Sequence, residues 1–327
     1  MIRSFDWRDF PSLHRNRHHG LYLDTSVALT RSLTRIPVGA LLSYVAPATG
    51  IFTYVATNDG DSSGRIIGQF SHNPGSHYAH LVFLAPEKAL ASPDTPALLD
   101  YIAQQAGKRG AHNLLAEVNE RSVAFDVLRK AGFAIYSRQR IWRIDREAGE
   151  NGEQPPWKPV TEKDQHAIRH LYSSLVPALV QQAEPPPWEN MNGLVCYHGE
   201  ELLGYVRLIY GPHGILAQPF IHPNVEQASA HIAAITRAIP SRRSRPLYMV
   251  VRSHQAWLEL YLTELNAEPG LYQAVMVKRL VIPQKIVNTL KLNHTGLENI
   301  QPETPSVLIP SGNEPVVTLY DTAKNYR

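Results

Sequence analysis

The chain has 327 residues, 43% hydrophobic and 19% charged, a composition typical of folded proteins and long enough for about two domains. This composition excludes disorder throughout the chain. Because 32 Lys and Arg residues nearly balance 29 Asp and Glu residues, the net charge of +3 does not indicate a nucleic-acid partner. The single cysteine, Cys196, excludes an internal disulfide and a cysteine-rich metal site, and it is expected to be a small buried residue in a strand.

The beginning of the chain does not have the pattern of an exported protein. Residues 1–9 carry four charged side chains where a secretory signal needs an apolar core, so we expect a cytoplasmic protein. The longest stretch without formal charge, residues 37–58, is interrupted by proline and glycine. This pattern favours two strands, at 40–45 and 51–56, over a membrane span.

Strands and helices then alternate up to a polar segment at residues 147–156. Strands are expected at 64–70, 80–84, 114–118 and 134–144, and helices at 96–108 and 123–130. Gly132 is the expected stop of the second helix. Residues 147–156 end in two prolines and are predicted to be a linker between a domain at 1–146 and a domain at 157–281.

The second domain repeats the order of the first. A helix is expected to begin at Thr161, followed by strands at 194–197, 202–208, 215–221, 247–251 and 271–280 and by helices at 228–238 and 256–265. Gly68 matches Gly204 and Val118 matches Val251, an offset that indicates a tandem duplication. Residues 282–327 are expected to be a poorly ordered tail or a late additional strand.

One strand-then-helix segment resembles a known family. Residues 114–133, which end in Arg129-Lys130-Ala131-Gly132-Phe133, resemble the corresponding segment of the GNAT acetyltransferase superfamily, and residues 248–267 carry a weaker version. The resemblance covers roughly residues 1–145 and 157–281. It implies an α/β (α+β mixed sheet) fold of two tandem GNAT-like acyl-CoA N-acyltransferase domains, in which a splayed sheet holds acetyl-CoA between two strands.

The same resemblance implies acetyl-CoA as co-substrate, with its pantetheine arm bonded along an exposed strand edge. The matching strands are 81–84 and 218–221. The expected cofactor-binding residues are Leu81, Val82, Phe83, Leu84, Phe220 and Ile221.

The phosphate loops depart from the family pattern of Gln or Arg, two residues, Gly, one residue, and Gly or Ala. Such loops bind the CoA pyrophosphate through backbone N–H groups at a helix start. Residues 86–99 contain no glycine, and Pro93 and Pro96 remove two donors. Residues 222–230 also lack glycine but have no proline inside the helix start. The departure leaves three possibilities: both copies bind CoA atypically, only the second is active, or the protein is a non-catalytic binding or regulatory protein.

Three residues are candidates for the chemistry. Many family members protonate the departing thiolate with a Tyr about four residues before the Gly-Phe pair, a position held here by Leu128 and Leu262. Tyr261, adjacent to Leu262, is the candidate acid. Glu117 and His80 lie on strands and are candidate general bases, the alternative for Glu117 being a carboxylate that faces solvent.

Two basic clusters carry alternative interpretations. His14 and His18 have the spacing of two ligands on one helical face but no carboxylate or cysteine partner nearby, so a solvated helix end or loop is expected in place of a metal site. The resemblance implies that this early segment lines the acceptor pocket, so contact with an acceptor carboxylate is the alternative role for these histidines and the neighbouring arginines. The run at 242–245 contains three arginines and is expected to be a solvated loop, or else a contact for a CoA phosphate. The sequence therefore predicts an acetyl-CoA-dependent N-acetyltransferase-like protein whose acceptor is an amine of a small molecule or a protein, with neither a nucleic acid nor a membrane as partner.

Overall fold

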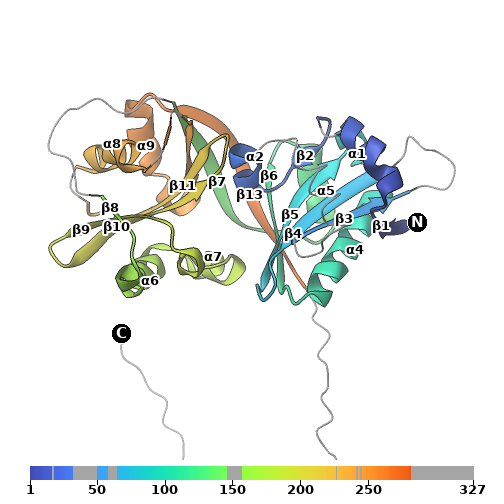
Figure 1. Ribbon diagram of the computed structural model, residues 1–327, viewed down its shortest axis with the longest axis horizontal. Coiled ribbons are helices and arrows are strands. Elements are labelled where there is room, and N and C mark those ends of the chain that lie inside the picture. Colours follow the sequence, from blue (N-terminus) through green and yellow to red (C-terminus); the bar gives the residue numbers. More distant parts are fainter. Residues whose placement is uncertain are drawn as a thin grey trace, which may run out of the picture. The chain divides into compact units, whose positions relative to one another are not determined.

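We describe a computed structural model of the chain, shown in Figure 1. The structure describes residues 1–16, 18–31, 50–57, 65–145, 157–225, 227–240, 242–243 and 245–280. The strand expected at 40–45, the linker at 147–156 and the tail at 282–327 lie outside these residues. All described residues belong to one compact unit. We call residues 1–145 the first half and residues 157–280 the second half.

The first half contains one mixed set of strands and helices. Its elements are β1 (Ile2–Ser4), α1 (Phe10–Asn16), β2 (Leu21–Tyr22), α2 (Thr25–Thr30), β3 (Ile51–Ala56), β4 (Ile66–His72), β5 (Tyr78–Ala85), α4 (Asp94–Lys108), β6 (Asn113–Asn119), α5 (Val123–Lys130) and β7 (Ala134–Ile144). The predicted bounds of α5 and β7 are confirmed. Gly132 has a φ of +83°, which confirms the predicted helix stop because this conformation favours glycine.

The second half repeats much of this order. Its elements are β8 (Lys158–Pro159), α6 (Gln165–Leu175), α7 (Ala178–Ala183), β9 (Gly193–His198), β10 (Glu201–Tyr210), β11 (Ile215–Ile221), α8 (Ala228–Ala238), β12 (Leu247–Arg252), α9 (Leu258–Glu264) and β13 (Glu268–Arg279). Thr161 and Asp164 form the expected capping box, which introduces a short 3-10 helix before α6. The final strand begins earlier than the predicted residue 271, because Glu268 and Pro269 already lie opposite Arg143 and Trp142 of β7.

The strands form one mixed sheet that runs through both halves. Its order is β1-β3-β4-β5-β6-β13-β7-β12-β11-β10-β9-β8. In the first half β4 and β5 are antiparallel whereas β5 and β6 are parallel, and β10, β11 and β12 repeat this pattern. These pairings confirm the predicted α/β mixed-sheet class. Because the sheet is continuous, the domain boundaries at 146 and 157 stay a prediction.

The last strands of the two halves are exchanged. β13, from the end of the second half, pairs with β6 of the first half, whereas β7, from the end of the first half, pairs with β12 of the second half. β7 and β13 also pair with each other, so they join the halves at the centre of the sheet. Figure 1 shows these two long strands running between the two groups of helices.

Helices cover the sheet around separate apolar clusters. In the first half α4 and α5 pack their buried residues, among them Leu98, Ile102 and Leu128, against β4, β5 and β6. In the second half α8 and α9 pack in the same way against β11 and β12, and α6 and α7 cover a further cluster with β10. Each cluster also takes residues from the other half, for example Met276 in the first-half cluster and Trp142 in the second-half cluster. Burial of these apolar faces provides most of the stabilisation of a fold of this kind.

Gly68 and Gly204, matched in the sequence, both allow close approach of a large side chain. A Cβ atom on Gly68 would lie 2.5 Å from Cδ1 of Ile102, and one on Gly204 would lie 2.8 Å from Cη2 of Trp157. The two glycines occupy similar places in their strands, since Gly68 lies opposite Leu84 and Gly204 opposite Ile221. The match therefore reflects a shared packing requirement.

Two expectations about single residues have clear outcomes. Cys196 is 1% exposed, which confirms that it is a buried strand residue. The solvated-loop interpretation of the arginine run is wrong for Arg242, which is 6% exposed and donates to the carbonyl oxygens of Ile144 and Asp145 at 2.7 and 3.1 Å. None of the helices in the described residues is both long and apolar enough to cross a membrane.

Candidate functional site

The candidate site lies where two pairs of parallel strands diverge. The pairing of β5 with β6 ends at His80 and Leu115, and that of β11 with β12 ends at Ala217 and Met249. Beyond these points the strands of each pair are no longer bonded to each other, so each half has a splayed opening in its sheet.

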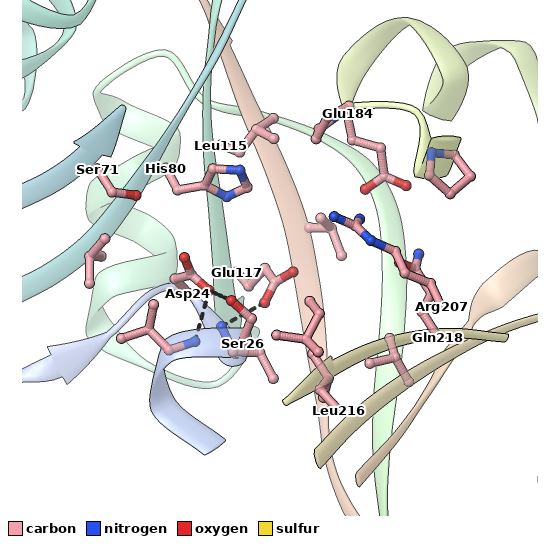
Figure 2. Close-up of a pocket in the computed structure, with 18 of the residues that line it drawn as sticks. Asp24, Ser26, Ser71, His80, Leu115, Glu117, Glu184, Arg207, Leu216 and Gln218 are labelled. Carbon is pink, nitrogen blue, oxygen red and sulfur yellow. Dashed lines mark hydrogen bonds between the residues drawn. The ribbon is translucent and has the colours of Figure 1, made fainter. Parts of the chain in front are cut away.

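Both openings face one cavity of about 1070 Å³, shown in Figure 2. From the first half its walls include Asp24, His80, Val82, Leu115 and Glu117, and from the second half Glu184, Arg207, Leu216, Gln218, Phe220 and Arg252. This volume lies at the upper end of the range for small-molecule sites, so a cofactor end and an acceptor can share it.

The first half contributes carboxylates and an imidazole. Oδ1 of Asp24 caps α2 by accepting from the N–H of Val27 at 3.1 Å and from the hydroxyl of Ser26 at 2.7 Å. Oε2 of Glu117 accepts from the N–H of Thr25 at 2.8 Å. Figure 2 shows Glu117 and His80 on the cavity wall. Glu117 is therefore half-buried on the cavity wall, and its role as a base stays a prediction.

The second half contributes a buried ion pair. Nη2 of Arg252 donates to Oε2 of Glu184 at 2.6 Å, and the hydroxyl of Tyr136 donates to the same oxygen at 3.0 Å. The side chains of Arg252 and Glu184 are only 7% and 12% exposed. Burial is the largest single influence and would lower the pKa of Arg252, but Glu184, Tyr136 and Glu117 together outweigh it and the pKa is raised. The pKa of Tyr136 is raised by burial and then by Glu184.

Known structures share this strand arrangement. A GCN5-related N-acetyltransferase from Sphaerobacter thermophilus is similar with a TM-score of 0.53 at 10% identity, over 86% of this chain and 97% of that chain. This chain has the GNAT fold. A putative acetyltransferase from Pyrococcus horikoshii (TM-score 0.49, 10% identity, 88% and 91% coverage) and a tandem GNAT protein from the clavulanic acid biosynthesis pathway (0.48, 14%, 85% and 98%) are further similar structures. No protein-family model and no curated protein matches the sequence.

In the first half the GNAT strand opening is filled by the chain itself. β2 pairs with β5 so that Leu21 lies opposite Leu84 and Tyr22 opposite Phe83. The next residue, Leu23, donates its N–H to Val82 at 2.9 Å and accepts from the N–H of Glu117 at 2.8 Å. Residues 21–23 thus bridge β5 and β6 along the edge expected to hold the pantetheine arm.

In the first half the backbone N–H groups of the loop before α4, the expected phosphate loop, also bond within the chain. The N–H of Glu87 donates to the carbonyl of His19, that of Asp94 to the hydroxyl of Ser92, and that of Thr95 to the carbonyl of Ser92. Pro93 precedes α4 and supplies no donor. These backbone groups are satisfied within the chain and are not directed at an anion.

The second half differs from the first both at its strand opening and at the start of the following helix, α8. Within the described residues no strand fills the gap between the diverging parts of β11 and β12, which pair on their outer sides with β10 and β7. α8 begins at Ala228 without proline, and the N–H groups of Ala228 and Ser229 have no hydrogen-bond partner among the described residues. Pro219 supplies no N–H to either neighbour of β11. The second half therefore retains a splayed edge and a helix start with open donors.

The predicted site residues fall into two groups. His80, Glu117, Val82 and Phe220 line the cavity. Leu81, Phe83, Leu84 and Ile221 are at most 1% exposed and lie in the apolar clusters, so their side chains cannot contact a cofactor. Phe83 and Leu84 are also paired with β2 on one side and β4 on the other. Tyr261 lies half-buried on α9, its ring 6.0 Å from that of Trp257 and outside the cavity lining, and its catalytic role stays a prediction.

Sequence reasoning missed the second-half wall. Arg207 lies in an apolar strand, Arg252 ends another, and Glu184 comes from a distant segment; Tyr136, which bonds to Glu184, lies on β7 of the first half. The available signal was the arginine in the run Leu202–Leu208, because a charge within an apolar strand needs a partner or a ligand.

Proposed function

We propose that the protein is an acetyl-CoA-dependent N-acetyltransferase whose second half binds the cofactor. The observation that carries this proposal is the single cavity on which both splayed openings converge, with a carboxylate and an imidazole on its wall. The recurrence of the strand order supports the tandem duplication predicted from the sequence.

The choice of the second half follows from how the backbone donors are used. In the first half residues 21–23 bond to both strands of the opening, and the loop before α4 uses its N–H groups internally. In the second half the N–H groups of Ala228 and Ser229 stand at the start of α8, where the helix dipole favours an anion. A CoA pyrophosphate therefore fits the start of α8 better than the loop before α4.

The proposed chemistry is direct acyl transfer. The acceptor amine must lose a proton to attack the thioester carbonyl, and Glu117 or His80 accepts that proton. The new bond joins the amine nitrogen to the acetyl carbon, and the bond from that carbon to sulfur breaks. The leaving CoA thiolate takes up a proton, and the predicted donor Tyr261 lies outside the cavity lining, so this role requires that the thiolate leave on the side of α9.

Calorimetric titration of the full chain with acetyl-CoA tests the proposal. We expect micromolar binding at one site per chain, followed by release of free CoA when primary amines are added. Absence of heat at millimolar acetyl-CoA, together with absence of CoA release, would contradict the proposal and favour the non-catalytic binding protein that the phosphate loops suggest.

A further inference from the structure

We propose that the acceptor carries a carboxylate as well as its amine, and belongs to the amino acids and short peptides with a free carboxyl end. This inference rests on the proposed function, because it names the substrate class of the same cavity. Its evidence is the opposite charge of the two cavity walls.

Arg207 is the first part of that evidence. It lies on β10 and lines the cavity, and Figure 2 shows its side chain extending from the second-half wall toward the interior. Within the part of the chain that the structure describes, no carboxylate pairs with it. By contrast, Arg3, Arg138 and Arg140 each have an acidic partner. A half-buried guanidinium without a partner is suited to a ligand anion.

Arg252 adds donors on the same wall. Glu184 uses only its Nη2, and the buried Nε and Nη1 have no hydrogen-bond partner in the described structure. A buried donor without a partner is unfavourable, and a carboxylate in the cavity would satisfy it. Since Glu184 neutralises the charge of Arg252, the net positive charge of this wall comes from Arg207.

The first-half wall has the complementary net charge, because its two carboxylates, Asp24 and Glu117, outnumber the one arginine, Arg31, that the described segments contribute. Asp24 and Glu117 each use one carboxylate oxygen on backbone or hydroxyl donors, so Oδ2 of Asp24 and Oε1 of Glu117 have no partner among the described residues. These oxygens suit an ammonium group, and Glu117 also stands where a base is required. A molecule that spans the walls therefore presents its amine to the first half and its anion to the second.

The surface between the two charged walls is apolar. Leu115, Leu216, Phe220 and Val275 contribute to it. In a cavity of about 1070 Å³ the side chain of an amino acid or a short peptide can pack on this apolar surface while the amine and the carboxylate contact the charged walls, whereas a simple alkylamine has no anion for the second-half wall.

Matched pairs of acceptors test the inference. α-Amino acids and dipeptides are compared with their own carboxamides, which keep the amine and remove the negative charge. CoA release is measured for the wild-type chain, for Arg207→Gln, and for Arg169→Gln, a control on the exposed face of α6. We expect wild type and Arg169→Gln to prefer the carboxylate by about 10- to 100-fold in kcat/KM, the range of one charged hydrogen bond. In Arg207→Gln the preference should fall below about threefold.

Equilibrium binding of the same pairs separates this inference from the proposed function. Turnover without a carboxylate preference, or a preference that survives in Arg207→Gln, would overturn the substrate class and leave the acetyltransferase activity standing. Carboxylate-selective binding that requires Arg207 but gives no CoA release would support the cavity assignment while the proposed function fails. Neither binding nor turnover would overturn both.

Discussion

At the scale of single residues, Glu117 both accepts a structural hydrogen bond and is the proposed general base. One of its oxygens holds the N–H of Thr25 while the other faces the cavity. In Glu117→Gln the amide carbonyl still accepts from Thr25 but cannot take a proton from the amine. We expect kcat to fall by about 10²- to 10³-fold with little change in thermal stability. Steady-state kinetics with thermal unfolding would check this, and unchanged turnover would exclude Glu117 as the base.

His254 predicts a pH dependence of stability. Burial, followed by the charge of Arg252, lowers the pKa of His254 from 6.5 to about 4 in the folded chain. Its two ring nitrogens have no hydrogen-bond partner in the described structure. The unfolded chain takes up a proton below pH 6.5 whereas the folded chain does so only near pH 4. The free energy of unfolding should therefore fall as the pH drops through this window, by about 1–2 kcal/mol at pH 5.

Urea unfolding of wild type and His254→Gln at pH 7 and pH 5 would measure this effect. The difference between the two pH values should be smaller in the variant. His231, whose pKa is also lowered by burial, is present in both proteins, so its contribution cancels. Equal pH dependence in both proteins would show that His254 is not responsible.

Residue-level reasoning selected two residues that lie on the cavity wall, and their catalytic roles stay predictions. Glu117 and His80 were identified from their strands, and both line the cavity. Arg242 was misjudged because a run of arginines is usually solvated, and the carbonyls of Ile144 and Asp145 that bury it lie almost 100 positions earlier in the chain. Arg207 and Arg252 could not be recognised as site residues because the cavity that they line is formed by segments far apart in the sequence.

At the scale of elements, the starts of α4 and α8 should respond differently to a negative charge. Ser229→Asp places a carboxylate at the open start of α8, where we propose the pyrophosphate binds. Ala91→Asp places one in the exposed loop before α4, whose donors are already used. We expect Ser229→Asp to weaken acetyl-CoA binding at least about tenfold, and Ala91→Asp to leave it within about twofold.

Calorimetry on the two variants would decide between the halves. Weaker binding in Ala91→Asp alone would assign the cofactor to the first half and contradict the proposal. Circular dichroism should show intact helices in both proteins, since each substituted side chain is solvent-accessible.

Most elements were predictable because their apolar spacing is local. The bounds of α5, α8 and β7 agree with the sequence prediction, since amphipathic spacing and flanking turn residues fix them. β2 was not predicted because two residues carry no periodic pattern, and its place depends on bonds to Val82 and Phe83. The sequence thus identified which strands open but missed the segment that fills one opening.

At the scale of the whole molecule, exchange of β7 and β13 makes the halves interdependent. Without β13, the edge of β6 from Asn113 to Asn119 lacks its antiparallel partner. We expect residues 1–146 and 147–284 to be insoluble or unfolded when expressed separately, and to form a stable 1:1 complex when co-expressed. Co-purification and thermal unfolding would check this, and a stably folded isolated first half would contradict it. Sequence reasoning expected two self-contained domains, because an exchange of pairing partners leaves the pattern of each strand unchanged.

The exchange also has a consequence during synthesis on the ribosome. β6 ends at Asn119, but its partner β13 begins only at Glu268, about 150 residues later. At about 5–20 residues per second, the inner edge of β6 waits roughly 7–30 s for its partner to be made. Throughout that interval the backbone N–H and C=O groups on this edge of β6 have no strand partner and can pair with strands of other chains. We therefore expect the yield of folded protein to depend on translation speed and on chaperones that shield nascent chains.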